Sequence, residues 1–195
     1  MGCGLVLAVV LGIAIWCFWA LARTGWVDLP VLSMGYRTPE PDHVVLQVPK
    51  HADVALPDPV RTSSGEQEFF LSEGVLTSAL REALAAPAFQ DLDGSRAQVA
   101  VVGSQLELFA PHATKPTAFR VYVVPEMRDG ELSFDLARVV VGQFALPSIL
   151  VRNLGTRLLS VGISALTEEA FSAFRVMDVE LVQEGVRVRI NSSPL

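Results

Sequence analysis

A continuous apolar run near the start of the chain constrains its fold more than any other feature. The run extends from Gly4 to Ala22, and its only ionisable side chain is the thiol of Cys17. As an α-helix it would be roughly 28 Å long, close to the thickness of the hydrocarbon core of a bilayer. Arg23 follows it directly. We therefore expect residues 1–23 to form a single-pass transmembrane anchor.

The same residues allow two other interpretations. A cleaved signal peptide has a basic start and a shorter apolar core, whereas no Lys or Arg precedes this run; Ala20-Leu21-Ala22 nevertheless fits a cleavage site. A core helix of such uniform apolarity is rare in soluble domains. Three tryptophans toward the end of the run favour the anchor, because indole rings prefer the headgroup region: Trp16, Trp19 and Trp26.

The charge of the chain limits its partners. The formal net charge is −6, which opposes nucleic-acid binding and strong electrostatic docking onto anionic lipid, since both need clustered Lys and Arg. Both cysteines, Cys3 and Cys17, lie in or beside the apolar run. The rest of the chain therefore has no disulfide framework and no cysteine-based metal site.

Residues 24–65 are rich in proline and predict a tether between the anchor and a folded domain. Proline at this density favours extended chain over helix. Residues 43–48 could form one short strand. An irregular arm packed on the domain is an equal alternative to a free tether. The prolines are Pro30, Pro39, Pro41, Pro49, Pro57 and Pro59.

Residues 66–195 predict one α+β domain. Hairpins are indicated at Gly103-Ser104, Asp129-Gly130 and Glu184-Gly185. One helix is expected after the N-cap Ser72 and ends before Pro87, a second begins at Pro147, and a third covers residues 167–174. We expect an antiparallel meander sheet packed against two or three helices. The predicted strands are residues 66–71, 97–102, 105–110, 117–124, 131–141, 175–182 and 186–190.

The sequence has no catalytic signature. Its three histidines have no metal-binding spacing, and the motifs of a nucleophile elbow, a phosphate loop and a dinucleotide loop do not occur. We therefore predict that the protein is not an enzyme and uses no cofactor and no metal.

Several predicted strands are apolar on both faces, for example at Val99, Val101 and Val102. This doubling indicates a second buried face: an internal lipid cavity, a partner contact or a sheet curled on itself. An unusually thick ordinary core is the alternative. The candidate apolar ligand face consists of Leu76, Leu80, Leu84, Phe119, Val121, Val123, Phe134, Phe144, Leu150 and Leu154.

The arrangement of elements resembles the YpmS-like family of bacterial membrane-anchored proteins of uncharacterised function. The matching pieces are Phe70-Leu71-Ser72-Glu73-Gly74-Val75-Leu76, Asp129-Gly130 and Val141-Gly142-Gln143-Phe144-Ala145-Leu146-Pro147. The helix and meander are also similar to units of tubular lipid-binding proteins. The resemblance implies a cell-envelope protein with an extracytoplasmic body, although the positive charge after the run slightly favours a cytoplasmic one. It implies no catalytic residues.

These observations lead to one expected function and one alternative. We expect a single-pass, membrane-anchored envelope protein that binds an apolar ligand, a lipid. The alternative is a structural or assembly subunit that docks by an apolar face onto a membrane protein complex.

Overall fold

The protein is analysed as a computed structural model, in which the described residues are 2–27, 36–48, 60–61, 67–128, 131–148, 151 and 175–191; the side chains of α1 are described from Val9 onward. Its helices are α1 (Gly2–Thr24) and α2 (Glu73–Leu84), with short 3-10 helices η1 (Pro87–Phe89) and η2 (Gly94–Arg96). The strands are β1 (Val60–Arg61), β2 (Gln67–Ser72), β3 (Gln98–Val102), β4 (Gln105–Pro111), β5 (Ala118–Arg128), β6 (Glu131–Val141), β7 (Phe144–Ala145), β8 (Arg175–Val182) and β9 (Gly185–Asn191).

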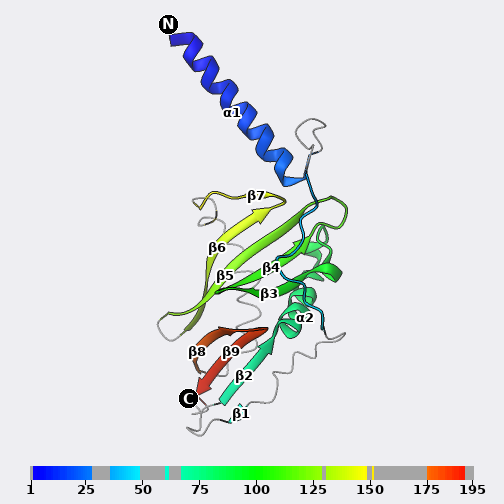
Figure 1. Ribbon diagram of the computed structural model, residues 1–195, viewed down its shortest axis with the longest axis vertical. Helices are drawn as coiled ribbons and strands as arrows, with labels where there is room; N and C mark the ends of the chain where they lie inside the picture. The colour runs from blue at the N-terminus through cyan, green and yellow to red at the C-terminus, as the bar shows by residue number, and fades with distance from the viewer. Residues whose placement is uncertain are drawn as a thin grey trace.

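The described strands form two antiparallel sheets stacked along the long axis of the molecule (Figure 1). A five-stranded sheet, in the order β3-β4-β5-β6-β7, lies next to α1. A four-stranded sheet, in the order β1-β2-β9-β8, lies at the opposite end. The predicted α+β class and the antiparallel strands are confirmed. The prediction of a single meander sheet is wrong. Because β2 pairs with β9, the last hairpin belongs to a separate sheet from the central strands.

Helix α1 projects from the end of the five-stranded sheet (Figure 1). It carries Arg23 in its last turn, and Gly25 follows with a φ of +73°, a left-handed conformation that favours glycine at a helix end. Among the residues described with their side chains, no helix is both long enough and apolar enough to span a membrane.

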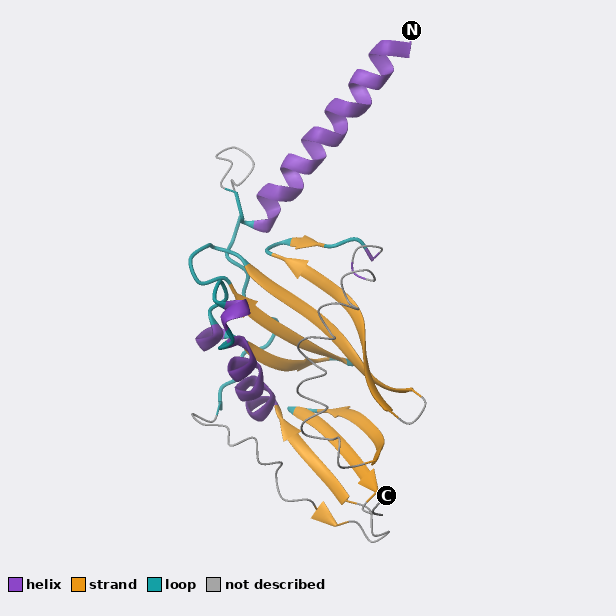
Figure 2. Cartoon of the chain, turned by 180° about the vertical axis from the view of Figure 1, so that it is seen from behind, coloured by secondary structure: helices purple, strands orange, loops and turns teal. Residues whose placement is uncertain are grey.

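The two sheets share one apolar core. Its fully buried members come from both sheets, and Leu76 and Leu80 of α2 pack against them. Helix α2 lies along the side of the body beside β3, as Figure 2 shows from behind. The buried core residues are Phe69, Val99, Leu106, Val123, Val176, Val186, Val188 and Ile190.

The turns agree with the sequence in two hairpins and differ in the third. Gly103 and Ser104 connect β3 to β4, and the connection between β5 and β6 has the two predicted residues, 129–130, which lie outside the described residues. The last turn is Gln183-Glu184, one residue earlier than predicted. Gly185 is needed for another reason: a Cβ there would lie 2.8 Å from the ring of Phe70 in the neighbouring strand.

Residues 43–48 are not a strand. They belong to an extended segment, residues 36–48, that lies against the five-stranded sheet; we call it the arm. The arm is packed on the domain, since the backbone N–H groups of Asp42 and Val45 donate to side chains of the sheet. Residues 28–35 and 49–59 of the expected tether lie outside the described part of the chain.

The helix predicted from Pro147 begins one residue later, at Ser148. The Val151 N–H donates to the Pro147 carbonyl oxygen at 3.1 Å, which is the first hydrogen bond of a helical turn. The remainder of that helix and the helix predicted over residues 167–174 fall outside the described residues.

Candidate functional site

The predicted ligand face is divided between two places in the fold. Five of its residues meet in the core between the sheets, where Val123 is buried and the other four are partly buried: Leu76, Leu80, Val121, Val123 and Phe134. Leu84 is in the last turn of α2, partly buried. Leu150 and Leu154 lie outside the described residues.

Phe119 and Phe144 lie at the other place, beside the end of α1. The ring of Phe144 is 6.2 Å from that of Trp16, centroid to centroid, and the ring of Phe119 is 6.5 Å from that of Trp26. Both were predicted to belong to the ligand face with the core residues, because Phe119, Val121 and Val123 alternate along one face of a strand. That face is longer than the core, so its end reaches the junction with α1.

A β-bulge keeps both halves of β6 facing the core. Val121 pairs with Val139, but Val123 pairs with Leu136, so β6 has one extra residue at this point. Without the extra residue, the apolar side chains of one half of β6 would point to the outer face of the sheet. Phe134 and Leu136 consequently pack on the core together with Val121 and Val123.

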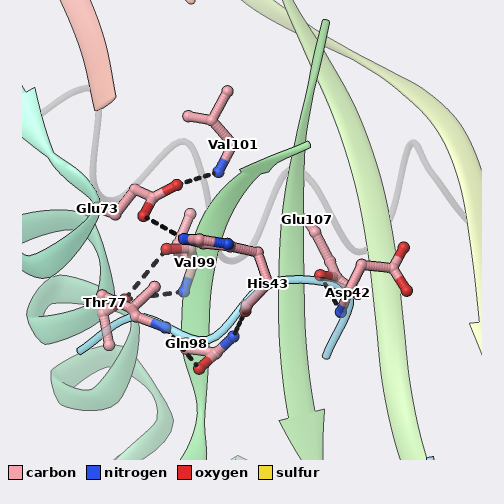
Figure 3. A network of polar contacts seen from close by, with 9 residues as sticks. Asp42, His43, Glu73, Thr77, Gln98, Val99, Val101 and Glu107 are labelled. Atoms are coloured by element: carbon pink, nitrogen blue, oxygen red, sulfur yellow. Dashed lines mark hydrogen bonds and ion pairs between the residues drawn. The ribbon is translucent and has the colours of Figure 1, made fainter. Parts of the chain in front are cut away.

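The outer face of the five-stranded sheet carries a polar network beneath the arm (Figure 3). Glu107 of β4 is fully buried, and its Oε2 accepts a hydrogen bond from the backbone N–H of Asp42 at 2.9 Å. The Tyr122 hydroxyl donates to Asp42 Oδ2 at 2.8 Å. Arg120 Nη1 lies 3.1 Å from Asp42 Oδ1. Asp42 therefore joins the arm to two neighbouring strands.

Burial sets the titration of this network. It raises the pKa of Glu107 above that of an ordinary glutamate, against the stabilising hydrogen bond from the Asp42 backbone. It also raises the pKa of Tyr122, and the hydrogen bond to Asp42 adds to the effect. Both shifts favour the uncharged forms.

A second set of contacts joins the arm to α2 through β3 (Figure 3). The side chain of Gln98 donates to the carbonyl oxygen of His43 and accepts from the N–H of Val45. The imidazole Nε2 of His43 lies 3.6 Å from Glu73 Oε2. These contacts hold the arm across the edge of the sheet.

The contacts of the network fasten the arm to the sheet. The buried carboxylate of Glu107 lies within hydrogen-bonding distance of a backbone N–H and a phenol, neither of which is a nucleophile of the Ser, Thr or Cys type. Within the described part of the chain, no three His, Cys, Asp or Glu side chains are placed to hold a metal ion. The arrangement can fasten the arm and can titrate.

Neither Glu107 nor Asp42 was predicted as a site residue. In the pattern of β4, Glu107 alternates with apolar residues and therefore predicts a solvent-facing side chain. Its partner Asp42 is 65 positions earlier, in an irregular segment. A local pattern carries no signal for such a contact.

Helix α1 is hydrogen-bonded to the body at its C-terminal end. The Gln143 N–H donates to the Arg23 carbonyl oxygen at 2.8 Å, and Arg23 Nη1 donates to Gln143 Oε1 at 2.9 Å. The Thr117 hydroxyl donates to the Thr24 carbonyl oxygen. Because a helix end leaves its last carbonyl groups unpaired, the body completes the hydrogen bonding of α1.

No family model matches the chain, and neither the curated proteins nor the solved structures contain a match. The resemblance to the YpmS-like family therefore stays a prediction from the sequence pattern, and function has to be argued from the geometry.

Proposed function

We propose that this protein is a single-pass, membrane-anchored envelope protein whose extracytoplasmic body binds an apolar ligand, a lipid, beside the bilayer. The YpmS-like resemblance, which is part of the proposal, favours this side of the membrane.

The exposed surface of α1 supports the anchor. Its described side chains from Val9 to Leu21 are apolar, and most of them are about half exposed, for example Ile15 at 61% and Phe18 at 55%. A continuous apolar surface of this size is rarely left in water. The apolar run in the sequence also continues to Gly4, which gives the length that a bilayer requires.

The single observation that carries ligand binding is the incomplete burial of inward-facing apolar side chains between the sheets. Leu76, Val121 and Phe134 pack against the core but remain partly exposed. A fully closed core between two sheets and a helix would exclude water from such positions. An acyl chain lying along them would remove this surface from water at about 0.8 kcal/mol per methylene group.

Native mass spectrometry of the full-length chain in detergent tests this function. We expect a bound lipid mass that survives detergent exchange. Leu80→Trp should place a bulky ring among these inward-facing side chains and remove the bound lipid. Leu46→Trp is the matched control, because Leu46 is 90% exposed on the arm; it should keep the lipid. A chain that is always free of lipid would contradict the proposal.

One observation favours the alternative function, a subunit that docks onto a membrane protein complex. The four-stranded sheet exposes large apolar side chains at the end opposite α1, among them Phe70 at 45% and Met177 at 48%. This alternative predicts that a protein partner co-purifies with the chain, and that Phe70→Asp releases the partner without releasing lipid.

A further inference from the structure

The C-terminal end of α1 is fixed to the body by hydrogen bonds. The Arg23 and Thr24 carbonyl groups are both hydrogen-bonded to the body, to the turn between β6 and β7 and to the loop before β5. The body therefore cannot move away from the end of α1 without breaking these bonds. If α1 is bound at a surface, the part of the body next to its end is therefore brought close to the same surface.

Strand β7 contacts α1 through the side chain of Phe144. The ring of Phe144 contacts that of Trp16 edge to face, at 6.2 Å between centroids. Trp16 precedes Arg23 by two turns, which corresponds to about 10 Å along a helix axis. The ring of Phe144 therefore contacts the apolar surface of α1 on the N-terminal side of its last turn.

Two cations lie beside indole rings near the C-terminal end of α1. The guanidinium carbon of Arg23 is 5.4 Å from the centre of a Trp19 ring, and Lys115 Nζ is 4.0 Å from the centre of the Trp26 ring. Trp26 also packs edge to face on His112, and it remains 45% exposed. Indole rings with a cation beside them suit the headgroup region, where the ring meets apolar groups and the cation meets phosphate.

We propose that the body makes a second contact with the bilayer, in which Phe144 and the β6–β7 turn enter the interface while Trp26 and Lys115 lie among the headgroups. This inference rests on the proposed membrane anchor. The occupant of the surface is the lipid interface because the surface adjoins α1 and combines apolar rings, with Trp26 45% exposed and Phe144 partly exposed, with the cations Arg23 and Lys115. The body then rests directly on the membrane, and its inter-sheet core lies at a fixed distance from it.

Site-directed spin labelling of the full-length chain tests this contact. The background carries Cys3→Ser and Cys17→Ser, and the chain is reconstituted in phosphatidylcholine vesicles containing phosphatidylglycerol. Single labels are placed at Phe144→Cys and at Met177→Cys, a position that is 48% exposed on the far sheet. Power saturation then compares collisions with oxygen, which concentrates in lipid, and with a water-soluble nickel chelate.

We expect the label at 144 to collide more with oxygen than with nickel, and the label at 177 to show the reverse. Ala145→Cys, on the same strand, provides a second label position in case the Phe144 variant misfolds, and circular dichroism checks the fold of each. If 144 and 145 are as accessible to nickel as 177 while the chain resists alkaline extraction, the second contact is refuted and the anchor remains. If alkaline extraction releases the chain, both proposals fail.

Discussion

Glu107 is the residue whose environment differs most from what its neighbours in the sequence suggest. A fully buried carboxylate is costly in its charged form unless donors surround it. Here the donor is a backbone N–H from the arm at 2.9 Å, while the Tyr122 hydroxyl lies 3.4 Å away and donates its single proton to Asp42 at 2.8 Å. The backbone hydrogen bond does not fully compensate burial, since the pKa of Glu107 remains raised. Ionising Glu107 therefore costs more in the folded chain than in the unfolded chain.

This cost predicts the sign of a pH effect. Below the ordinary glutamate pKa of about 4.3, Glu107 is protonated in the folded and unfolded chain alike. As the pH rises past that value the unfolded chain ionises first, so this residue lowers the free energy of unfolding until its raised folded pKa is passed. We expect Glu107→Gln to gain stability relative to wild type over this window and to keep a constant difference above it.

Urea unfolding of the full chain in detergent from acidic to mildly alkaline pH measures this difference. Glu82→Gln is the matched control, because Glu82 is exposed on α2. A difference between Glu107→Gln and wild type that does not change with pH would show that the arm does not bury this carboxylate.

At the scale of elements, α2 protects the open edge of the five-stranded sheet. Its side chains bond to the backbone of β3 as a neighbouring strand would. Thr77 Oγ1 accepts from the Val99 N–H at 2.9 Å and donates to the Val99 carbonyl oxygen at 3.2 Å. Glu73 accepts from the Val101 N–H at 2.6 Å, and Arg81 donates to the Ala97 carbonyl oxygen at 2.8 Å. Covering an edge in this way prevents pairing with other chains.

Thr77 gives a sharp test of this edge protection. Thr77→Val keeps the volume but leaves the buried N–H and C=O of Val99 without their partner, which should cost about 1–3 kcal/mol. Thr77→Ser retains the hydroxyl and should retain most of the stability. Urea unfolding measures both variants, and light scattering should show aggregation only for Thr77→Val. Equal losses in the two variants would mean that packing, and not the hydrogen bonds, matters at this position.

The elements themselves were largely predictable, whereas their assembly was not. The Ser72 hydroxyl accepts from the Val75 N–H at 3.4 Å and begins α2 where the sequence places its N-cap. Turn residues such as Gly103 mark hairpins because the required backbone conformation is local. The pairing of Gln67 with Ile190 is not local. The alternation of apolar residues does not indicate which hairpins belong to the same sheet, so one sheet was predicted where there are two.

The candidate site shows the same division. Alternation correctly placed Val121, Val123 and Phe134 together on an inward face. It could not show that the face ends at α1, which separates Phe119 and Phe144 from the others. The polar network depends on the arm, and the pairing of an irregular segment with a distant strand leaves no periodic trace in the sequence.

At the scale of the whole molecule, the junction between α1 and the body depends on Gly142. Its φ is +62°, and a Cβ there would lie 2.6 Å from the carbonyl carbon of Thr24 and 2.8 Å from the carbonyl oxygen of Arg23. Gly103 has nearly the same φ, +63°, but has nothing within 4 Å of such a Cβ. A substitution at Gly103 therefore tests backbone strain alone, whereas one at Gly142 adds a steric clash with the end of α1.

We therefore expect Gly103→Ala to cost about 1–2 kcal/mol, the strain of a left-handed alanine, and Gly142→Ala to cost more. In thermal unfolding of the full chain in detergent, Gly142→Ala should have the lower midpoint. It should also speed tryptic cleavage after Arg23, because displacing Thr24 opens the junction, whereas Gly103→Ala should leave that cleavage unchanged. Equal cleavage rates in both variants would contradict a close-packed junction.

The pairing of β2 with β9 also has a consequence for the time course of folding. Synthesis proceeds from the N-terminus, so Phe69 emerges long before its partner Val188. Until then β2 can pair only with the two-residue strand β1, and closing so long a loop slows folding. The hairpins β3–β4 and β5–β6 can form as soon as they appear. The sheet next to α1 is thus expected to assemble first, and the far sheet last.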